Sequence, residues 1–326
     1  MRLWQLHEVG DPIDKLQIDE AEIPEPGAGE IVIDVEAVGL AFPDVLQCQG
    51  KYQIPTTPPF TPGGESAGVV RALGDGVDRH RIGDRVFGMG GGLREQATLT
   101  ADWSWPVPDS LTSAQAAALP INYGTTWFAL HDRARIAEGE SLLVTGAAGG
   151  TGSAAIQLGK AAGARVIAVA GGEEKAGYCH SLGADLVIDH RAVPQFVDAV
   201  KEATDGKGVD VAYDPVGGDV FHQVRRCMAW DGRLLVIGFV AGIPDAPANH
   251  ILLKNYSLVG VHWGASLGRD PQSLDRQMRN VLDLARAGAV DPLLFPPTPF
   301  ERAAEALQAI ADRGVYGKAV VEVGSA

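Results

Sequence analysis

A glycine-rich loop between an apolar run and a stretch of small residues constrains the fold of this chain more than any other feature. Residues 141–145 are typical of a buried parallel strand, the glycine turn 146–152 follows, and residues 153–158 favour a helix. Glycine suits such a turn because the turn is tight, the backbone approaches a pyrophosphate, and the helix N-terminus then faces that anion. A second strand expected at 165–170 completes a dinucleotide-binding βαβ unit of roughly 30 residues. The alternative is an ordinary glycine-rich loop of an α/β protein.

Strand-like and helix-like segments alternate from about residue 125 onward. This alternation predicts a parallel sheet with crossover helices. In residues 271–287 an apolar face recurs at helical spacing, formed by Leu274, Met278, Val281, Leu282 and Ala285. The expected strands are 141–145, 165–170, 185–189, 209–213, 233–238 and 258–262, and further helices are expected at 174–182 and 194–204.

The first 113 residues have a different sequence pattern, in which proline and glycine separate short strand-like segments. Residues 30–38 alternate apolar and polar side chains, the pattern of a half-buried strand. At the C-terminal end a helix is expected at 301–312 and a strand at 319–323. We therefore expect a β-rich domain of residues 1–120 plus 290–326, with the nucleotide-binding domain of residues 121–289 inserted into it.

Composition excludes several classes of function. The chain has 326 residues, enough for two domains, and its net charge of −14 argues against binding to nucleic acid. No apolar run reaches the roughly 18 residues of a membrane span, and the N-terminus has no hydrophobic signal segment, so we expect a cytoplasmic protein. Cys48, Cys179 and Cys227 are too widely spaced for a metal-binding cysteine motif and suit a reducing compartment.

The end of the second strand bears on which nucleotide binds. Enzymes that prefer NAD usually carry an acidic residue there for the ribose 2′-hydroxyl, whereas this strand ends in Ala170-Gly171-Gly172. Lys175 and His190 lie near the predicted strand ends, so the sequence favours NADPH over NADH. Glu173 and Glu174 argue the other way, although as first-turn acids they also suit the helix dipole. Lys175 has the alternative role of a solvated helix residue, and His190 that of a surface residue at a strand end.

Several segments in fixed order resemble one known family. Besides the glycine loop they are Phe42-Pro43-Asp44, Gly50-Lys51-Tyr52, residues 62–68, 83–88, 214–218 and 260–264, and Gly317-Lys318. On these segments the chain resembles the medium-chain dehydrogenase/reductase superfamily and, within it, the zinc-free quinone oxidoreductases related to zeta-crystallin. The resemblance runs nearly end to end. It implies an α/β fold in which a Rossmann doubly wound parallel sheet is inserted in a β-rich GroES-like catalytic domain.

The resemblance also permits a test for zinc. Zinc-dependent members carry a cysteine where Ala41 stands, a histidine where Gly64 stands and a further ligand near Asn122, and residues 89–109 lack the cysteines of their structural lobe. Zinc requires nitrogen, sulfur or carboxylate ligands, so we expect no metal. Without a Lewis acid, the expected small-molecule substrate is a quinone or an alkene conjugated to a carbonyl, because both accept hydride directly.

Site residues follow from the same resemblance. It implies that Phe42 and Tyr52 line the substrate cleft and that Asn122 and Thr125 lie near the nicotinamide. Tyr52 is expected to donate a hydrogen bond to the acceptor oxygen or to form a pocket wall, with plain packing as the alternative. Tyr123 has the same ambiguity. The remaining residues implied around NADPH are Gly146, Ala148, Gly149, Gly150, Thr151, Gly152, Val216, Gly238, Phe239, Trp263, Gly264 and Lys318, together with Lys175 and His190.

Some positions depart from the family or favour a structural role. Many relatives carry asparagine where Ala41 stands, so an amide that could hold a water or the cofactor is lost. Asp44 is interpreted as a helix N-cap rather than a catalytic group, and Trp127 as a core residue. The leading hypothesis is a zinc-independent NADPH:quinone oxidoreductase. The alternatives are an NADPH-dependent enoyl or alkenal reductase and a non-catalytic, crystallin-like NADPH-binding protein. An exposed sheet edge expected near residues 258–261 predicts a homodimer.

Overall fold

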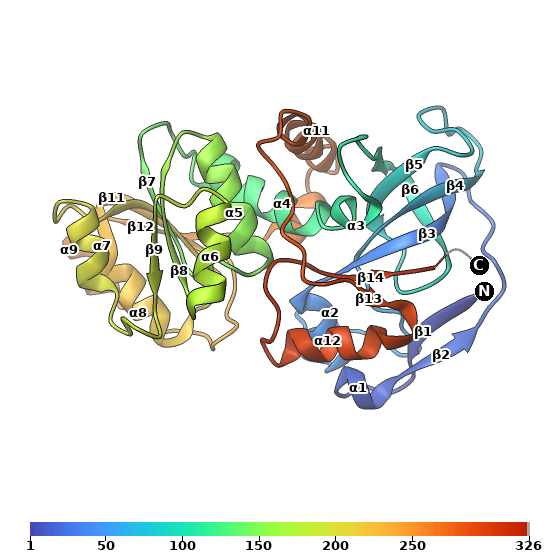
Figure 1. The fold of residues 1–326 in the computed structure, drawn as a ribbon, viewed down its shortest axis with the longest axis horizontal. Coiled ribbons are helices and arrows are strands. Elements are labelled where there is room, and N and C mark those ends of the chain that lie inside the picture. Colours follow the sequence, from blue (N-terminus) through green and yellow to red (C-terminus); the bar gives the residue numbers. More distant parts are fainter. Residues whose placement is uncertain (325–326) are drawn as a thin grey trace. The chain divides into compact units, whose positions relative to one another are not determined.

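The chain folds into two compact units, each built around its own sheet (Figure 1). The computed structural model describes residues 1–324. The first unit contains residues 1–121 and the described chain from Asp291 onward, and the second is the continuous segment Asn122–Val290. The first unit is therefore assembled from the two ends of the chain.

The second unit contains a six-stranded parallel sheet with the order β12-β11-β10-β7-β8-β9. Most residues of the central strands are buried and apolar, as expected of a parallel sheet covered on both faces. The strands are β7 (Ser141–Val144), β8 (Arg165–Ala170), β9 (Leu186–Asp189), β10 (Val209–Asp214), β11 (Met228–Val236) and β12 (Ser257–Gly260).

Helices cover both faces of this sheet. Figure 1 shows α5 (Gly150–Ala161) and α6 (Glu173–Ser181) on one face and α7 (Val197–Ala203) and α8 (Gly218–Cys227) on the other. The winding direction reverses between the adjacent strands β7 and β10. In open α/β sheets, ligands bind at the carboxyl ends of the strands at such a reversal. The other helices of this unit are α4 (Pro120–Trp127, of which Asn122 onward belongs here), the π-helix η1 (Phe128–Arg133), α9 (Ala248–Lys254), α10 (Trp263–Leu267) and α11 (Ser273–Arg286).

Small residues explain how closely α5 approaches the sheet. A Cβ on Gly159 would lie 2.6 Å from Leu142 Cδ2 and 3.2 Å from Val166 Cγ2, so only glycine fits between this helix and strands β7 and β8. The apolar face expected on α11 is confirmed, because Leu274, Met278, Val281, Leu282 and Ala285 are all buried.

The first unit is a β-rich structure in which β3 pairs with three other strands. Its N-terminal residues pair with β6, its C-terminal residues pair with β14, and β4 runs along most of its length. With β5 between β4 and β6, these pairings close the sheet on itself. The strands are β1 (Arg2–Leu6), β2 (Leu16–Glu20), β3 (Glu30–Leu40), β4 (Glu65–Leu73), β5 (Arg85–Gly90), β6 (Gln96–Pro106), β13 (Thr298–Pro299) and β14 (Ala319–Glu322), and the helices are α1 (Pro12–Lys15), α2 (Phe42–Cys48), α3 (Ser113–Ala116), η2 (Phe300–Arg302) and α12 (Ala303–Ala311).

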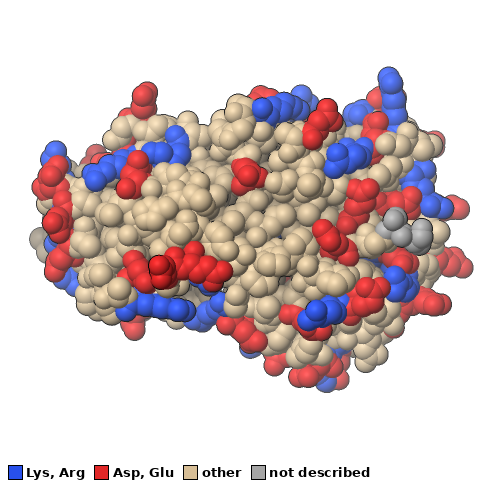
Figure 2. All heavy atoms as spheres, viewed as in Figure 1, with Lys and Arg blue, Asp and Glu red and all other residues tan. Residues whose placement is uncertain are grey.

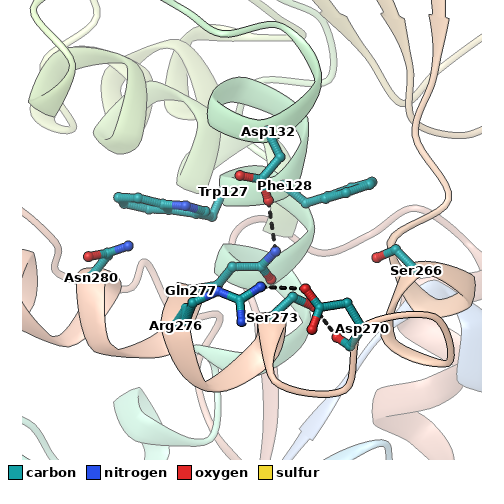
Figure 3. Close-up of a pocket in the computed structure, with 9 residues that line it drawn as sticks. All are labelled: Trp127, Phe128, Asp132, Ser266, Asp270, Ser273, Arg276, Gln277 and Asn280. Carbon is teal, nitrogen blue, oxygen red and sulfur yellow. Dashed lines mark hydrogen bonds and ion pairs between the residues drawn. The ribbon is translucent and has the colours of Figure 1, made fainter.

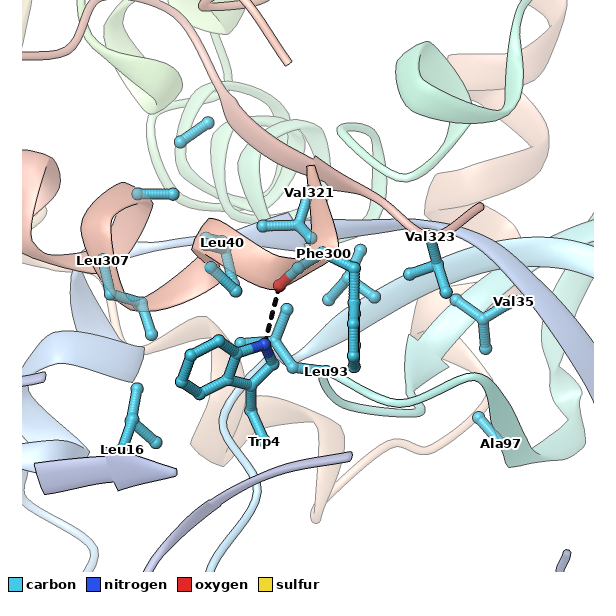
Figure 4. Close-up of a cluster of buried hydrophobic side chains, with 14 of the residues drawn as sticks. Trp4, Leu16, Val35, Leu40, Leu93, Ala97, Phe300, Leu307, Val321 and Val323 are labelled. Atoms are coloured by element: carbon cyan, nitrogen blue, oxygen red, sulfur yellow. Dashed lines mark hydrogen bonds between the residues drawn. The ribbon is translucent and has the colours of Figure 1, made fainter. Parts of the chain in front are cut away.

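Residues from both ends of the chain share the core of this unit (Figure 4). The indole Nε1 of Trp4 donates a hydrogen bond of 2.7 Å to the carbonyl oxygen of Phe300, and the two rings meet edge to face at 6.5 Å. Leu307 of α12 and Val321 of β14 belong to the same cluster. The N-terminal strand is thus packed against the C-terminal segment.

The strand expected at 233–238 is displaced in the structure, where β11 covers Met228–Val236. The pairing of β10 with β11 is irregular before Arg233, and Asp231 has a φ of 62°. The sequence Asp231-Gly232 resembles a turn, but here it forms an irregularity inside the strand. Gly238 consequently lies in the loop that follows β11.

On the face drawn in Figure 2, Lys and Arg side chains are interspersed among Asp and Glu. Among the helices of residues 1–324, none has the length and apolarity that crossing a membrane requires.

Candidate active site

The loops that follow β7 and β10 are joined by a buried hydrogen bond. Thr145 Oγ1 donates to Asp214 Oδ1 at 2.6 Å, and the same carboxylate oxygen accepts the N–H groups of Val216 at 3.0 Å and Gly217 at 3.3 Å. Burial raises the pKa of Asp214, while these hydrogen bonds oppose the rise. Asp214 therefore shapes the loop at the reversal point of the sheet.

The glycine loop has the close backbone packing that its sequence predicts. A Cβ on Gly152 would collide with the carbonyl oxygen of Gly146 and lie 2.8 Å from Ala147 Cα, so α5 can begin here only without side chains. Gly146 has a φ of 55°, which favours glycine, and Val216 borders it at 3.2 Å from its Cβ position. The first N–H groups of α5 have no partner within the helix and face outward from its end. This backbone cradle fits a pyrophosphate group.

Helix α4 brings Asn122 to the opening of α5. A Cβ on Gly150 would lie 2.6 Å from Asn122 Nδ2, so the carboxamide occupies the space above this glycine. Asn122 is 5% exposed, and its carbonyl oxygen accepts a hydrogen bond of 2.7 Å from Thr126 Oγ1. Thr125 is half-buried on the same helix. Of the residues expected near the nicotinamide, the structure thus places Asn122 directly beside the glycine loop.

Trp263 packs against the same helix. Its ring lies on Gly124, where a Cβ would be 2.5 Å from Trp263 Cζ2, and its Nε1 donates to Gln277 Oε1 at 2.9 Å. Gln277 Nε2 in turn donates to Asp132 Oδ2 at 2.9 Å. Trp263 is therefore a buried supporting residue.

The other residues expected near the cofactor lie in varied surroundings. Phe239 is exposed, and Gly238 lies beside the Pro215 carbonyl. Gly264 has open space at its Cβ position, and Ala148 is buried in the glycine loop.

Trp127 does not belong to the core, so its interpretation as a core residue is wrong. It is half-buried, stacks on His131 at 4.0 Å, and lines a hollow of about 360 Å³. In Figure 3 Trp127 and Phe128 extend to opposite sides of this hollow, above Gln277. The helical pattern of residues 126–130 could not identify the buried face, because α4 gives way to a π-helix at Phe128.

The turn between β8 and α6 is bordered by the residues after β9. The carboxylate of Asp189 accepts the N–H groups of Gly172 at 2.8 Å and Arg191 at 2.9 Å, and these bonds lower its pKa. A Cβ on Gly171 would lie 2.6 Å from His190 Nε2, and one on Gly172 3.0 Å from an Arg191 guanidinium nitrogen. His190 and Arg191 thus flank the turn, and Lys175 lies in the first turn of α6. The arrangement gathers basic side chains where the 2′-phosphate is expected.

In the first unit, Asp44 connects helix α2 to the loop before β4. Asp44 Oδ2 accepts the Ala41 N–H at 2.7 Å, and Oδ1 accepts the Gly63 N–H at 3.0 Å. The interpretation of Asp44 as the N-cap is wrong, because α2 begins at Phe42 and Ala41 is the N-cap. Proline is tolerated in a first helical turn, so Pro43 does not delay the helix. Burial raises the pKa of Asp44 despite its hydrogen bonds.

Tyr52 and Phe42, the residues expected to line the substrate cleft, are both half-buried. Burial raises the pKa of the Tyr52 phenol, and the charge of Asp44 raises it further. The phenol is therefore protonated at neutral pH and able to donate a hydrogen bond.

Lys318 forms an ion pair with Glu65 in the interior of the first unit. The two side chains are 3% and 0% exposed, and Glu65 Oε2 also accepts the Ile121 N–H at 2.7 Å. The expected contact of Lys318 with the cofactor remains a prediction. The structure adds a partner that the sequence did not reveal, since no local signal links two residues so far apart in the chain.

No three His, Cys, Asp or Glu side chains come together as a possible metal site within residues 1–324. Ala41 and Gly64, at the positions of zinc ligands in zinc-dependent relatives, have no side-chain ligand atoms. Cys48, Cys179 and Cys227 are buried, and burial raises the pKa of each thiol to about 12.

Comparison with known proteins identifies the family. The alcohol dehydrogenase GroES-like domain matches residues 27–109, and the zinc-binding dehydrogenase domain matches residues 150–285. The quinone oxidoreductase-like protein 2 homolog of Nematostella vectensis is 38% identical over 98% of this chain and 88% of its own length. The chain belongs to the quinone oxidoreductase family. As a medium-chain dehydrogenase/reductase it is an oxidoreductase, with a Rossmann-like parallel sheet and a β-rich GroES-like domain.

Solved structures of this quinone oxidoreductase family and its neighbours have the same fold. The quinone oxidoreductase of Escherichia coli, solved in complex with NADPH, has a TM-score of 0.89 and 26% identity, covering 99% of this chain and 100% of that one. The CurK enoyl reductase has a TM-score of 0.90 and 26% identity, covering 99% of both chains. NADPH complexes among these neighbours support NADP(H) binding in the family.

Proposed function

We propose that this protein transfers hydride from NADPH to a quinone without a metal ion. The observation that carries the proposal is the packing of the Asn122 carboxamide over Gly150, where the glycine loop opens into α5. A polar group at the opening of a pyrophosphate cradle suits the nicotinamide end of a dinucleotide. The lack of ligand atoms at Ala41 and Gly64 favours an acceptor that needs no Lewis acid.

The residues of the second unit would bind the cofactor. Gly146 and residues 149–152 fit the pyrophosphate, while Lys175 supplies positive charge and His190 a ring N–H donor for the 2′-phosphate. Asn122 and Thr125 would orient the nicotinamide. Bound NADPH supplies the hydride. The contribution of the protein is to fix these groups before the cofactor arrives.

Residues of the first unit would receive the acceptor. Hydride addition to a quinone leaves negative charge on oxygen, and a protonated phenol stabilises that charge by hydrogen bonding. Tyr52 is such a donor because burial raises its pKa. Phe42 offers an apolar wall for a flat ring.

An enoyl reductase is the second candidate. The CurK enoyl reductase matches the fold along 99% of this chain. Reduction of a conjugated alkene also delivers hydride to an electron-poor carbon and places charge on oxygen, so the same residues suit both reactions.

Parallel assays separate these functions. Purified, chelator-treated protein is given NADPH with ortho-quinones, para-quinones, alkenals and a short enoyl-CoA, and NADPH consumption is recorded. We expect turnover of quinones with NADPH well above NADH, unaffected by chelator. Turnover of enoyl-CoA or alkenals alone would assign the protein to the second candidate. NADPH binding without turnover of any acceptor would contradict both.

We further propose that the protein is a homodimer paired through β12. This strand is the edge of the parallel sheet, and Leu258 on it and Leu252 and Leu253 on α9 are exposed apolar side chains. Pairing of two edges would satisfy their backbone groups. Light scattering of wild type and of the double variant Leu252→Glu/Leu253→Glu tests this proposal. We expect wild type to be a dimer and the variant to dimerise more weakly.

The cytoplasmic location stays a prediction from the sequence.

A further inference from the structure

Two fully buried hydroxyl groups meet behind the proposed cofactor site. Thr126 on α4 and Tyr213 on β10 are both 0% exposed, and their side-chain oxygens lie 3.1 Å apart. Thr126 Oγ1 also lies 2.7 Å from the Asn122 carbonyl oxygen and 3.4 Å from the Thr151 carbonyl oxygen. Since a hydroxyl has one proton, the shortest of these contacts identifies Asn122 as the acceptor from Thr126.

The cluster joins three segments that would hold the cofactor. Thr126 and Asn122 belong to α4, Thr151 to the first turn of α5, and Tyr213 to the end of β10. Tyr213 is followed by Asp214, whose carboxylate shapes the 215–217 loop. The side chain of Thr151 also hydrogen-bonds Tyr213. The two helices and the strand are therefore connected through one set of hydroxyls.

Burial makes this connection stiff. A buried hydroxyl without a partner is costly, so each member of the cluster holds the others in place. Thr126 bonds the carbonyl four residues earlier, a bond that competes with the regular helix ladder, and α4 gives way to a π-helix two residues later. The hydroxyls of Thr126 and Tyr213 are shielded from solvent, so these two residues would act on the site only through the groups they hold.

We propose that Thr126 is a positioning residue whose hydroxyl fixes Asn122 and the first turn of α5 against β10, and thereby preorganises the NADPH site. The inference rests on the proposed function, in which these segments bind the cofactor. Thr126 itself does not contact the cofactor. Its effect is exerted through the Asn122 carbonyl and through Tyr213.

Two substitutions at this position separate the hydroxyl from the rest of the side chain. Thr126→Val keeps the branched shape and removes the hydroxyl, whereas Thr126→Ser keeps the hydroxyl. We expect NADPH binding, followed by nicotinamide fluorescence, to weaken about tenfold in Thr126→Val and to stay within about threefold of wild type in Thr126→Ser. Tyr213→Phe, which removes the partner hydroxyl, serves if Thr126→Val fails to fold.

Thr204→Val is a matched control in the same unit. Thr204 is also buried, and its hydroxyl likewise donates to the carbonyl four residues earlier, Val200, at 2.9 Å. It lies at the end of α7, away from the glycine loop, so the control should lose stability but not NADPH affinity. An equal loss of NADPH affinity in Thr204→Val and Thr126→Val would overturn the inference. Unchanged NADPH affinity in Thr126→Val, or NADPH binding by Thr126→Ser as weak as by Thr126→Val, would overturn it as well.

Because binding is measured without an acceptor, the test does not depend on which substrate is reduced. If wild type binds NADPH but reduces no quinone, the proposed acceptor is wrong and the inference is still decided by binding. If wild type does not bind NADPH, the proposed function fails, and hydrogen exchange at residues 122–126 and 150–153 decides the inference. Faster exchange in Thr126→Val than in Thr126→Ser is expected, and equal exchange would overturn it.

Discussion

Lys318 and Glu65 neutralise one another in the interior of the β-rich unit, where they are 3% and 0% exposed. Glu65 also accepts the N–H of Ile121, in the first turn of α4. An unpaired helix N-terminal N–H and a buried carboxylate thus satisfy each other, while Lys318 supplies the counter-charge. The ion pair and the Ile121 hydrogen bond link β4, the residue before β14 and the first turn of α4, which at Ile121 still belongs to the first unit.

Replacing Lys318 by methionine should destabilise the protein strongly. The substitution leaves the Glu65 carboxylate buried without its counter-charge, which typically costs about 3–5 kcal/mol. Urea unfolding measures the loss. Arg302→Met is the control, because Arg302 forms its ion pair with Glu305 on the surface, and such pairs contribute little. A loss in Lys318→Met no larger than in the control would contradict the prediction.

The same variant should be more sensitive to alkaline pH than wild type. Burial raises the pKa of Glu65, Lys318 opposes the rise, and nearby Asp44 adds to it. A carboxyl whose folded pKa lies above its unfolded pKa stabilises the fold at low pH, and that stability is lost as pH rises through the folded pKa. Without Lys318 the folded pKa rises further. The free energy of unfolding that Lys318→Met loses relative to wild type should therefore be larger at about pH 8 than at about pH 5. A loss that does not change with pH would disprove this explanation.

Two glycine-to-alanine substitutions should have opposite effects. At Gly152 the new Cβ collides with backbone atoms of Gly146 and Ala147, so we expect a loss of roughly 1–3 kcal/mol and weaker NADPH binding. At Gly177, within α6, the Cβ meets no atom within 4 Å, so alanine should stabilise by about 0.5–1 kcal/mol. Thermal unfolding and NADPH titration of both variants check the pair, and equal effects would refute the role given to the loop.

Lys175→Glu should shift the preference away from NADPH. The substitution places negative charge in the first turn of α6, beside the turn flanked by His190 and Arg191. Repulsion of the 2′-phosphate should lower kcat/KM for NADPH about tenfold or more, with little change for NADH. The control Lys201→Glu makes the same charge change on α7. A parallel decline for both cofactors would argue for damage to the fold instead.

Tyr52 should determine how the reaction depends on pH. Its phenol has a raised pKa, so the rate should remain flat to about pH 9 and fall only above the ordinary tyrosine pKa of about 10. Tyr52→Phe should lower kcat about tenfold or more, because a hydrogen-bond donor to the developing oxyanion is lost, with little effect on NADPH affinity. An unchanged kcat in Tyr52→Phe would leave the residue with a packing role only.

The three cysteines should resist alkylation in the folded protein. Burial raises the pKa of Cys48, Cys179 and Cys227 to about 12, so almost no thiolate forms near pH 8. Iodoacetamide labelling followed by mass spectrometry should show modification only after denaturation. Rapid native labelling of Cys48 would indicate that helix α2 opens more readily than its packing implies.

The parts of the fold that could be predicted from sequence are those coded by short-range patterns. The glycine loop, strand β8 and the apolar stripe of α11 each depend on residues within one or two turns or strands. The prediction that Asp44 is the N-cap of α2 is wrong because Phe42 and Pro43 already belong to that helix. The prediction that Trp127 is a core residue is wrong because periodicity does not show what packs against a helix face.

Contacts between distant residues escaped prediction for a different reason. Glu65 with Lys318, and Thr126 with Tyr213, are adjacent only because the sheets bring separate strands together. No pattern in a single sequence distinguishes a buried threonine in a helix from an exposed one. The site residues that the family resemblance implied came from motifs, whereas these supporting residues required the fold.

The packing of Trp4 against Phe300 has a consequence for synthesis on the ribosome. The continuous unit, Asn122–Val290, has all of its strands once residue 290 has emerged, whereas the unit that starts the chain must wait for the segment after Asp291. Until then β3 lacks β14 as a partner along Ala37–Leu40, and Trp4 lacks the carbonyl of Phe300. The part made first is therefore completed last, and its apolar core stays open during elongation.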